Sequence, residues 1–219
     1  SSAIDGGYDD LVRGGFGLTL VKVVALAVLM APFLPDGGRS VQVDAEQLQR
    51  RQRHRQILHP LEELYGQRHY QEGLGQVDRE LAAGHADPEL LLRLNVWRGD
   101  FLAMLGHSTE AIEQYHRVIQ GLQQAQDLDR ARLVHLHVSV AELYLRHLRD
   151  PERARAELEI ARRLNPDNSS VAVWLGYAAL ALDQPNEARR AIEPVRRRTP
   201  EDPDVLLISE RAAVQAGEP

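Results

Sequence analysis

The stretch SVAVWLGYAALALDQPNEARRAIEPVRRRTPED, residues 170–202, decides the fold of this chain. A turn at residues 183–185 is followed by Ala188, which opens an amphipathic helix, and Gly176 lies twelve residues before Ala188. Two antiparallel helices cross at close range only where side chains are this small, while leucine and isoleucine fill the surrounding holes. Pro200 ends the second helix because proline cannot continue the hydrogen-bond ladder. The stretch therefore predicts a helical hairpin.

The same arrangement recurs along the chain. The small residues that open an amphipathic helix after a turn are separated by 38, 43 and 34 residues, which is a period of 34 with insertions of four and nine. The nine-residue insertion falls in residues 121–133, where we expect a longer helix and a looser turn. The small residues are Gly73, Ala111, Ala154 and Ala188, and the positions twelve residues before them hold Leu61, Gly99, Glu142 and Gly176.

With this period and these small residues, the chain resembles the tetratricopeptide repeat family, whose helix–turn–helix units stack into a right-handed superhelix. The resemblance covers about residues 54–219 and is strongest from residue 135 onward; Glu142 and Leu61 depart from the small-residue pattern. It implies an all-α solenoid with an extra helix at 44–57, four helix pairs and a capping helix. The pairs are expected at about 54–84, 88–122, 130–164 and 169–200, and the capping helix at 203–216.

Composition agrees with a helical, folded chain and excludes several classes of function. Hydrophobic residues make up 43%, charged residues 26% and aromatic residues only 5%, which disfavours both disorder and an all-β enzyme. The absence of cysteine excludes disulfides, zinc knuckles, iron–sulfur clusters and thiol catalysis. The net charge of −6 gives no field that favours nucleic acid. All basic residues except Lys22 are arginine, which is typical of a GC-rich, bacterial genome.

An apolar run, FGLTLVKVVALAVLMAPFL at residues 16–34, precedes the repeats and carries one charge. As a helix it is roughly 28 Å long, enough to span the bilayer core, so it predicts a transmembrane anchor. A buried helix and a signal sequence are the alternatives. Lys22 inside the span is predicted to reach the headgroups or to dock against a neighbouring membrane helix. The predicted organisation is a tail at 1–15, a transmembrane helix at 16–35, a linker at 36–43 and the repeat domain at 44–219.

Flanking charges predict the orientation of this anchor. One arginine, Arg13, precedes the apolar run, whereas five follow it between residues 39 and 55. The positive-inside rule then places the repeat domain in the cytoplasm, on a single pass through the bacterial inner membrane. A periplasmic repeat domain is the alternative.

Sequence motifs for catalysis, metal binding or cofactor binding are missing. No phosphate-binding loop occurs, and His135 and His137, two residues apart on a helix, point about 160° away from each other and cannot share a metal. Carboxylate pairs such as Glu62 and Glu63 lack a companion acid–base group at a fixed spacing. We therefore expect no enzyme activity, no metal and no cofactor.

The family resemblance implies an inner groove lined by the first helix of each pair. The clamp that some family members use for a terminal carboxylate is missing, and an apolar groove with tyrosines suits an amphipathic helix or an extended hydrophobic segment. The helix at 44–57 is an alternative occupant of the first part of this groove. The groove positions are Arg55, Leu58, Glu62, Tyr65, Arg93, Val96, Asp100, Leu136, Ser139, Leu143, Ser170, Val173 and Tyr177.

These observations predict a membrane-anchored scaffold that assembles a bacterial membrane or envelope complex through protein–protein contacts. The partners are expected to be proteins of a membrane complex, reached through the span and the groove, with no nucleic acid; a homo-oligomer is an open alternative. An envelope assembly factor outside the cytoplasm is one rival interpretation. Another is an obligate structural subunit of a larger membrane enzyme, with no exchangeable ligand.

Overall fold

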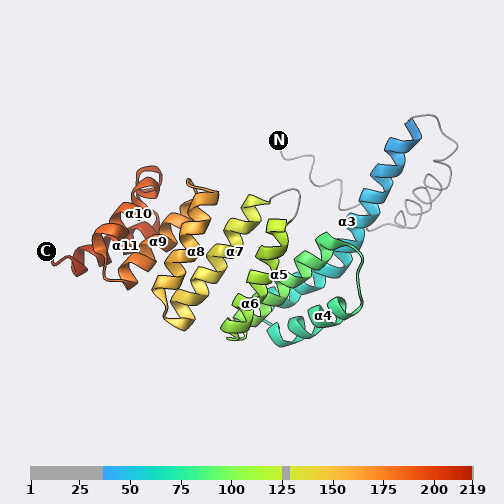
Figure 1. The fold of residues 1–219 in the computed structure, drawn as a ribbon, viewed down its shortest axis with the longest axis horizontal. Coiled ribbons are helices and arrows are strands. Elements are labelled where there is room, and N and C mark those ends of the chain that lie inside the picture. The colour runs from blue at the N-terminus through green and yellow to red at the C-terminus, as the bar shows by residue number, and fades with distance from the viewer. Residues whose placement is uncertain (1–36, 125–128, 219) are drawn as a thin grey trace. The chain divides into compact units, whose positions relative to one another are not determined.

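A computed structural model describes the backbone of residues 37–124 and 129–218, and side chains within these ranges from Glu46 onward. These residues form helices joined by turns, without a β-strand (Figure 1). The chain divides into two compact units, residues 1–60 and residues 61–219. The predicted all-α class is therefore confirmed for the part of the chain that is described.

Helix α3, Gly37–Gly66, differs from the elements predicted for this part of the chain. A single helix of 30 residues replaces both the linker at 36–43 and the separate helix at 44–57. The reason lies in the sequence between Gly38 and Pro60, which contains no glycine or proline and is rich in glutamine and arginine, both good helix formers. Residues 44–57 are therefore part of one continuous helix.

The predicted membrane span at residues 16–35, including Lys22, lies outside the described residues. Among the helices that are described, none has the length and apolar character needed to cross a bilayer.

The second unit is a row of helices that pack in adjacent pairs (Figure 1). Helices α5 with α6, α7 with α8 and α9 with α10 form such pairs, close to the predicted boundaries, and α11 follows as the terminal helix. The helices are α4 (Tyr70–Ala82), α5 (Pro88–Met104), α6 (Ser108–Gln124), α7 (Arg130–Leu143) with its π-helical continuation η2 (Tyr144–Leu148), α8 (Pro151–Leu164), α9 (Ser169–Ala181), α10 (Pro185–Arg198) and α11 (Pro203–Gln215).

Short polar side chains and prolines fix where these helices begin. Asp150 accepts a hydrogen bond from the backbone N–H of Arg153, and Asn168 accepts one from Val171, so each caps the helix that follows. Proline lies in the first turn of α5, α8, α10 and α11, where its missing N–H costs nothing. The sequence therefore sets the helix starts locally.

Small residues lie where paired helices cross, as the 34-residue period predicts. A Cβ on Gly99 would lie 2.5 Å from Cε1 of Tyr115, and one on Gly176 would lie 2.9 Å from Cγ2 of Ile192. Ala111, Ala154 and Ala188, the small residues that open the second helices of the pairs, are fully buried. These crossings leave no room for a larger side chain.

Glu142, which departs from the small-residue pattern, is half-buried and pairs with Arg146 at 3.0 Å. Helix α7 continues beyond it as the π-helix η2 instead of ending in a regular turn.

The nine-residue insertion at residues 121–133 lengthens a helix, as expected. Helix α6 reaches Gln124 and has 17 residues, whereas α8 and α10 have 14 each.

Candidate protein-binding groove

A groove opens between η2, α9 and α11, with α9 as its floor. Its volume is about 560 Å³. We call it the inner groove, because the predicted groove residues of the fourth repeat, Ser170, Val173 and Tyr177, lie together in it. Its other lining residues are Leu145, Arg146, Ser169, Trp174, Ala181, Val195, Asp202, Asp204, Leu207 and Arg211.

Two aromatic rings form the centre of the inner groove. The ring centroids of Trp174 and Tyr177 are 5.7 Å apart, and the guanidinium carbon of Arg146 lies 5.1 Å from the Trp174 centroid, within cation–π range. The Tyr177 hydroxyl donates a hydrogen bond to Asp204 of α11. Burial and this bond raise the pKa of Tyr177 to about 12, so the hydroxyl stays protonated at neutral pH. The arrangement is a rigid apolar surface with charged groups beside it, the usual make-up of a protein-binding hot spot.

Helix α11 completes this groove, and the sequence analysis missed its contribution. Leu207 lines the groove and is 37% exposed, whereas its neighbour Leu206, 55% exposed, lies outside it. Trp174 and Arg146 were also missed. The sequence signal for the contribution of α11 was the pair of adjacent leucines, Leu206 and Leu207, because a capping helix normally has polar residues on its outer face.

Three other predicted groove residues are core residues, and that part of the assignment is corrected. Leu58, Leu136 and Leu143 are 2%, 0% and 5% exposed, so their side chains are not available to a partner. On α7, the predicted groove residues Leu136 and Leu143 belong to the hydrophobic core, where they pack against neighbouring helices.

Among the remaining predicted groove positions, Tyr65 and Asp100 lie close enough to interact electrostatically. Tyr65 packs edge-on against Trp97 and Phe101, with centroids 5.6 and 5.8 Å apart, and burial raises its pKa. Asp100 accepts a hydrogen bond of 2.6 Å from Tyr115, and burial raises its pKa. Val96 and Ser139 are half-buried, while Arg55, Glu62 and Arg93 are exposed. For these exposed and half-buried residues, partner binding stays a prediction.

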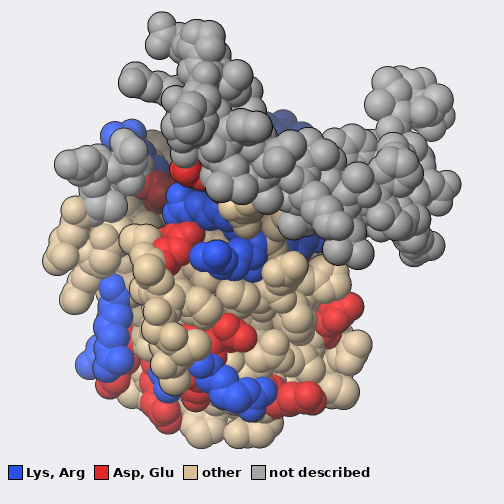
Figure 2. Space-filling view, turned by 90° about the vertical axis from the view of Figure 1, so that its right-hand side faces the viewer, with Lys and Arg blue, Asp and Glu red and all other residues tan. Residues whose placement is uncertain are grey.

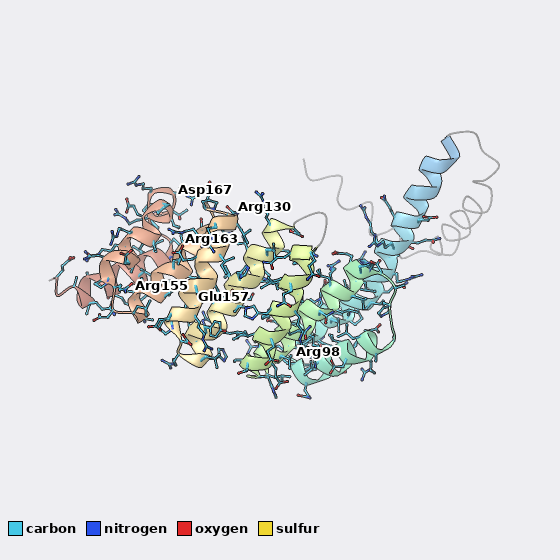
Figure 3. The ribbon with its side chains drawn as sticks, viewed as in Figure 1. Arg98, Arg130, Arg155, Glu157, Arg163 and Asp167 are labelled. Carbon is cyan, nitrogen blue, oxygen red and sulfur yellow. The ribbon has the colours of Figure 1, made fainter. Side chains whose placement is uncertain are left out.

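A polar cluster joins α6, α7 and α8 beneath the surface. Glu157 of α8, labelled in Figure 3, is the centre of the cluster. It accepts hydrogen bonds from His116 at 2.9 Å and from His137 at 2.6 Å, with each histidine in the tautomer that donates. Burial alone would raise the pKa of Glu157, but the two histidine bonds outweigh it and lower the pKa to about 2. Within the described ranges, no group of three or more His, Cys, Asp or Glu side chains could hold a metal ion. Through these two hydrogen bonds, the cluster links α6 of the second helix pair with α7 and α8 of the third.

Charge is mixed on the face of the molecule that Figure 2 shows. Where described residues are visible on it, basic and acidic side chains are interspersed with uncharged ones.

Comparison with protein-family models matches residues 145–210 to the tetratricopeptide repeat family. A comparison with curated proteins finds no match to this chain. The matched range runs from η2 into α11, so it contains nearly every residue that lines the inner groove. Tetratricopeptide repeats generally mediate the binding of protein partners and are generally non-catalytic scaffolds. Residues 145–210 are thus similar to the tetratricopeptide repeat family in the region where the sequence pattern is strongest.

Proposed function

We propose that this chain is a scaffold that holds a segment of a partner protein in the inner groove. The observation that carries the proposal is the half-buried aromatic centre, Trp174 and Tyr177, which lines the inner groove within the region that matches the repeat family. An apolar side chain of the partner packs on these rings and on Leu207. Charged groups at the margin, Arg146 and Arg211 beside Asp204, set its orientation.

Leu207→Asp is expected to weaken partner binding at least tenfold, because it removes the apolar side chain on which the partner packs and introduces a carboxylate that must lose its water when the partner binds. Leu206→Asp is the matched control, since it makes the same change one residue away and outside the groove. The measurement is quantitative mass spectrometry of proteins that co-purify with each full-length variant from its own cells. We expect a partner that is lost with Leu207→Asp and retained with Leu206→Asp.

Both leucines are already exposed, so neither variant should unfold, and the thermal unfolding temperature checks this. Recovery of identical proteins by the wild type and both variants would reject the inner groove as the binding site.

The finer part of the proposal is that residues 16–35 anchor the scaffold in the inner membrane of a bacterium, with the repeats on the cytoplasmic side. Its support is the apolar run and the arginines that follow it. Such an anchor raises the effective concentration of the bound partner at the membrane without a new contact.

Alkaline carbonate extraction of cell membranes tests the anchor. We expect the full chain to stay in the membrane pellet, and Leu26→Arg/Leu29→Arg, which adds two charges to the span, to move into the supernatant. Complete extraction of the unmodified chain would contradict membrane anchoring while leaving the inner groove untouched.

A further inference from the structure

A second cleft, of about 1260 Å³, lies between α8, α9 and α10. Helix α9 presents opposite faces to the two cavities: Val171, Leu175 and Ala179 face this cleft, whereas Trp174 and Tyr177 face the inner groove. These three residues form the floor and are almost completely buried, so the apolar surface open to the cleft is that of Ala172 and Ala191, which are half-buried, and of exposed Pro194. Substitutions in one cavity can leave the other intact.

Arginines dominate the walls of this cleft. One wall is a face of α8 and the other a face of α10, because the lining residues recur every three or four positions on each helix. Five arginines line the cleft, against three carboxylates. They are Arg155, Arg162, Arg163, Arg190 and Arg198; the carboxylates are Glu159, Asp183 and Glu187.

Two of these arginines are neutralised by carboxylates on their own helices. Arg162 pairs with Glu159 at 2.7 Å, and Arg190 pairs with Glu187 at 2.5 Å. Glu159 and Glu187 are therefore already paired and do not neutralise the other arginines of the cleft.

The other three arginines have no carboxylate partner among the residues that the structure describes. Arg155 Nη1 donates to the side-chain oxygen of Gln184 at 3.2 Å, at one end of the cleft. Arg198 Nη2 donates to the backbone oxygen of Asp167 at 3.3 Å, at the other end. Arg163 lies on α8, about two helical turns after Arg155 (Figure 3). A row of unneutralised guanidinium groups thus lies along an apolar floor.

We propose that this cleft binds an acidic amphipathic segment of another protein. Apolar side chains of the segment pack on Ala172, Ala191 and Pro194. Its carboxylates meet Arg155, Arg163 and Arg198, since guanidinium groups bind carboxylates through paired N–H donors. Nucleic acid suits the cleft less well, because Asp183 and the wall glutamates repel a continuous phosphate backbone and the floor offers nothing polar to it. This site is separate from the inner groove and does not depend on it.

The probe is a fluorescent synthetic peptide of about fourteen residues, the length of α8, with leucines at helical spacing and glutamates at the flanking positions. Fluorescence anisotropy is measured with the full chain in non-ionic detergent. We expect saturable binding that weakens as sodium chloride is raised, because the interaction depends on exposed charges. Arg155→Gln/Arg163→Gln is expected to weaken it at least about tenfold.

Two control proteins separate the cleft from general charge and from the inner groove. Arg79→Gln/Arg117→Gln removes two exposed arginines from α4 and α6, outside the cleft, and should bind the peptide within about twofold of wild type. Leu207→Asp should also bind it normally, because Leu207 lines only the inner groove. Circular dichroism and thermal unfolding confirm that each variant is folded.

Four results would overturn the proposal. They are no binding at about 1 mM chain, equal binding by Arg155→Gln/Arg163→Gln, equal binding of a peptide with glutamine at every glutamate position, and displacement of the peptide by a short DNA duplex that binds more tightly through the same arginines. The last result would assign the cleft to nucleic acid.

Discussion

Replacing Gly73 by alanine is expected to lower the free energy of unfolding by about 3 kcal/mol. Gly73 of α4 lies against the ring of Phe101 of α5, and a Cβ at this position would overlap Cε1 and Cζ of the ring, with Cδ1 only 2.9 Å away. Phe101 cannot move aside cheaply, because it is fully buried and packs against Tyr65 and Trp97. The two helices must therefore separate.

Urea denaturation of the full chain measures this effect. Gly121→Ala is the matched control: Gly121 lies exposed in α6 with open space around it, so alanine there should stabilise the chain by about 0.5 kcal/mol through helix propensity. In a Gly73→Ala/Phe101→Leu double variant, the smaller side chain should recover part of the loss that each single change causes. Equal effects of Gly73→Ala and Gly121→Ala would show that α4 and α5 are not in close contact.

The second large effect is expected from Glu157→Gln, which should cost about 2 kcal/mol near pH 5.5. The carboxylate accepts hydrogen bonds from His116 and His137, and an amide oxygen cannot replace two charge-assisted bonds. His137 is 4% exposed and its Nε2 has no hydrogen-bond partner, so the bond from Nδ1 to Glu157 is the one that satisfies the ring. Glu159→Gln is the control, because it removes only an exposed ion pair with Arg162.

The pH dependence of this difference follows from the signs of the pKa shifts. The pKa of Glu157 is lowered from 4.5 to about 2, so its stabilisation is complete above pH 4.5 and is lost as the pH falls toward 2. The pKa of His116 is raised above 6.5 by its bond to Glu157, so that contribution is complete below pH 6.5 and is lost as the pH rises through the raised value. Urea denaturation from pH 2 to pH 9 should therefore show the largest difference between wild type and Glu157→Gln at pH 4.5 to 6.5. A difference that does not change with pH would contradict the histidine–glutamate bridge.

Local rules explain how much of the fold the sequence could predict. The helix starts follow from proline and from short capping side chains such as Asp150, whose bonds reach only a few residues along the chain. The pairing follows from glycine and alanine at a fixed period, because sterics at a helix crossing tolerate few residue types. The fourth-repeat groove residues Val173 and Tyr177 were found for the same reason, since their spacing on α9 places them on one face.

These local rules could not predict which residues of α7, in the third repeat, are buried. Leu136 and Leu143 have the spacing of groove residues, but they lie in the core, because which face of α7 is covered depends on how its neighbours pack against it. The start of α3 was misplaced for a related reason. Polar residues between two glycine-containing stretches are compatible with a linker or with a helix, and composition does not separate the two.

By itself, the sequence of this protein determined the helices, their pairing and one face of the inner groove, because each depends on residues close together in the chain. Only the tertiary structure decided which distant side chains meet. Glu157 reaches His116 across 41 positions, Tyr177 reaches Asp204 across 27, and the arginines of α8 face those of α10 over an apolar floor. Such contacts depend on how the helices pack against each other, and the sequence separation of the two residues in a contact does not reveal that packing.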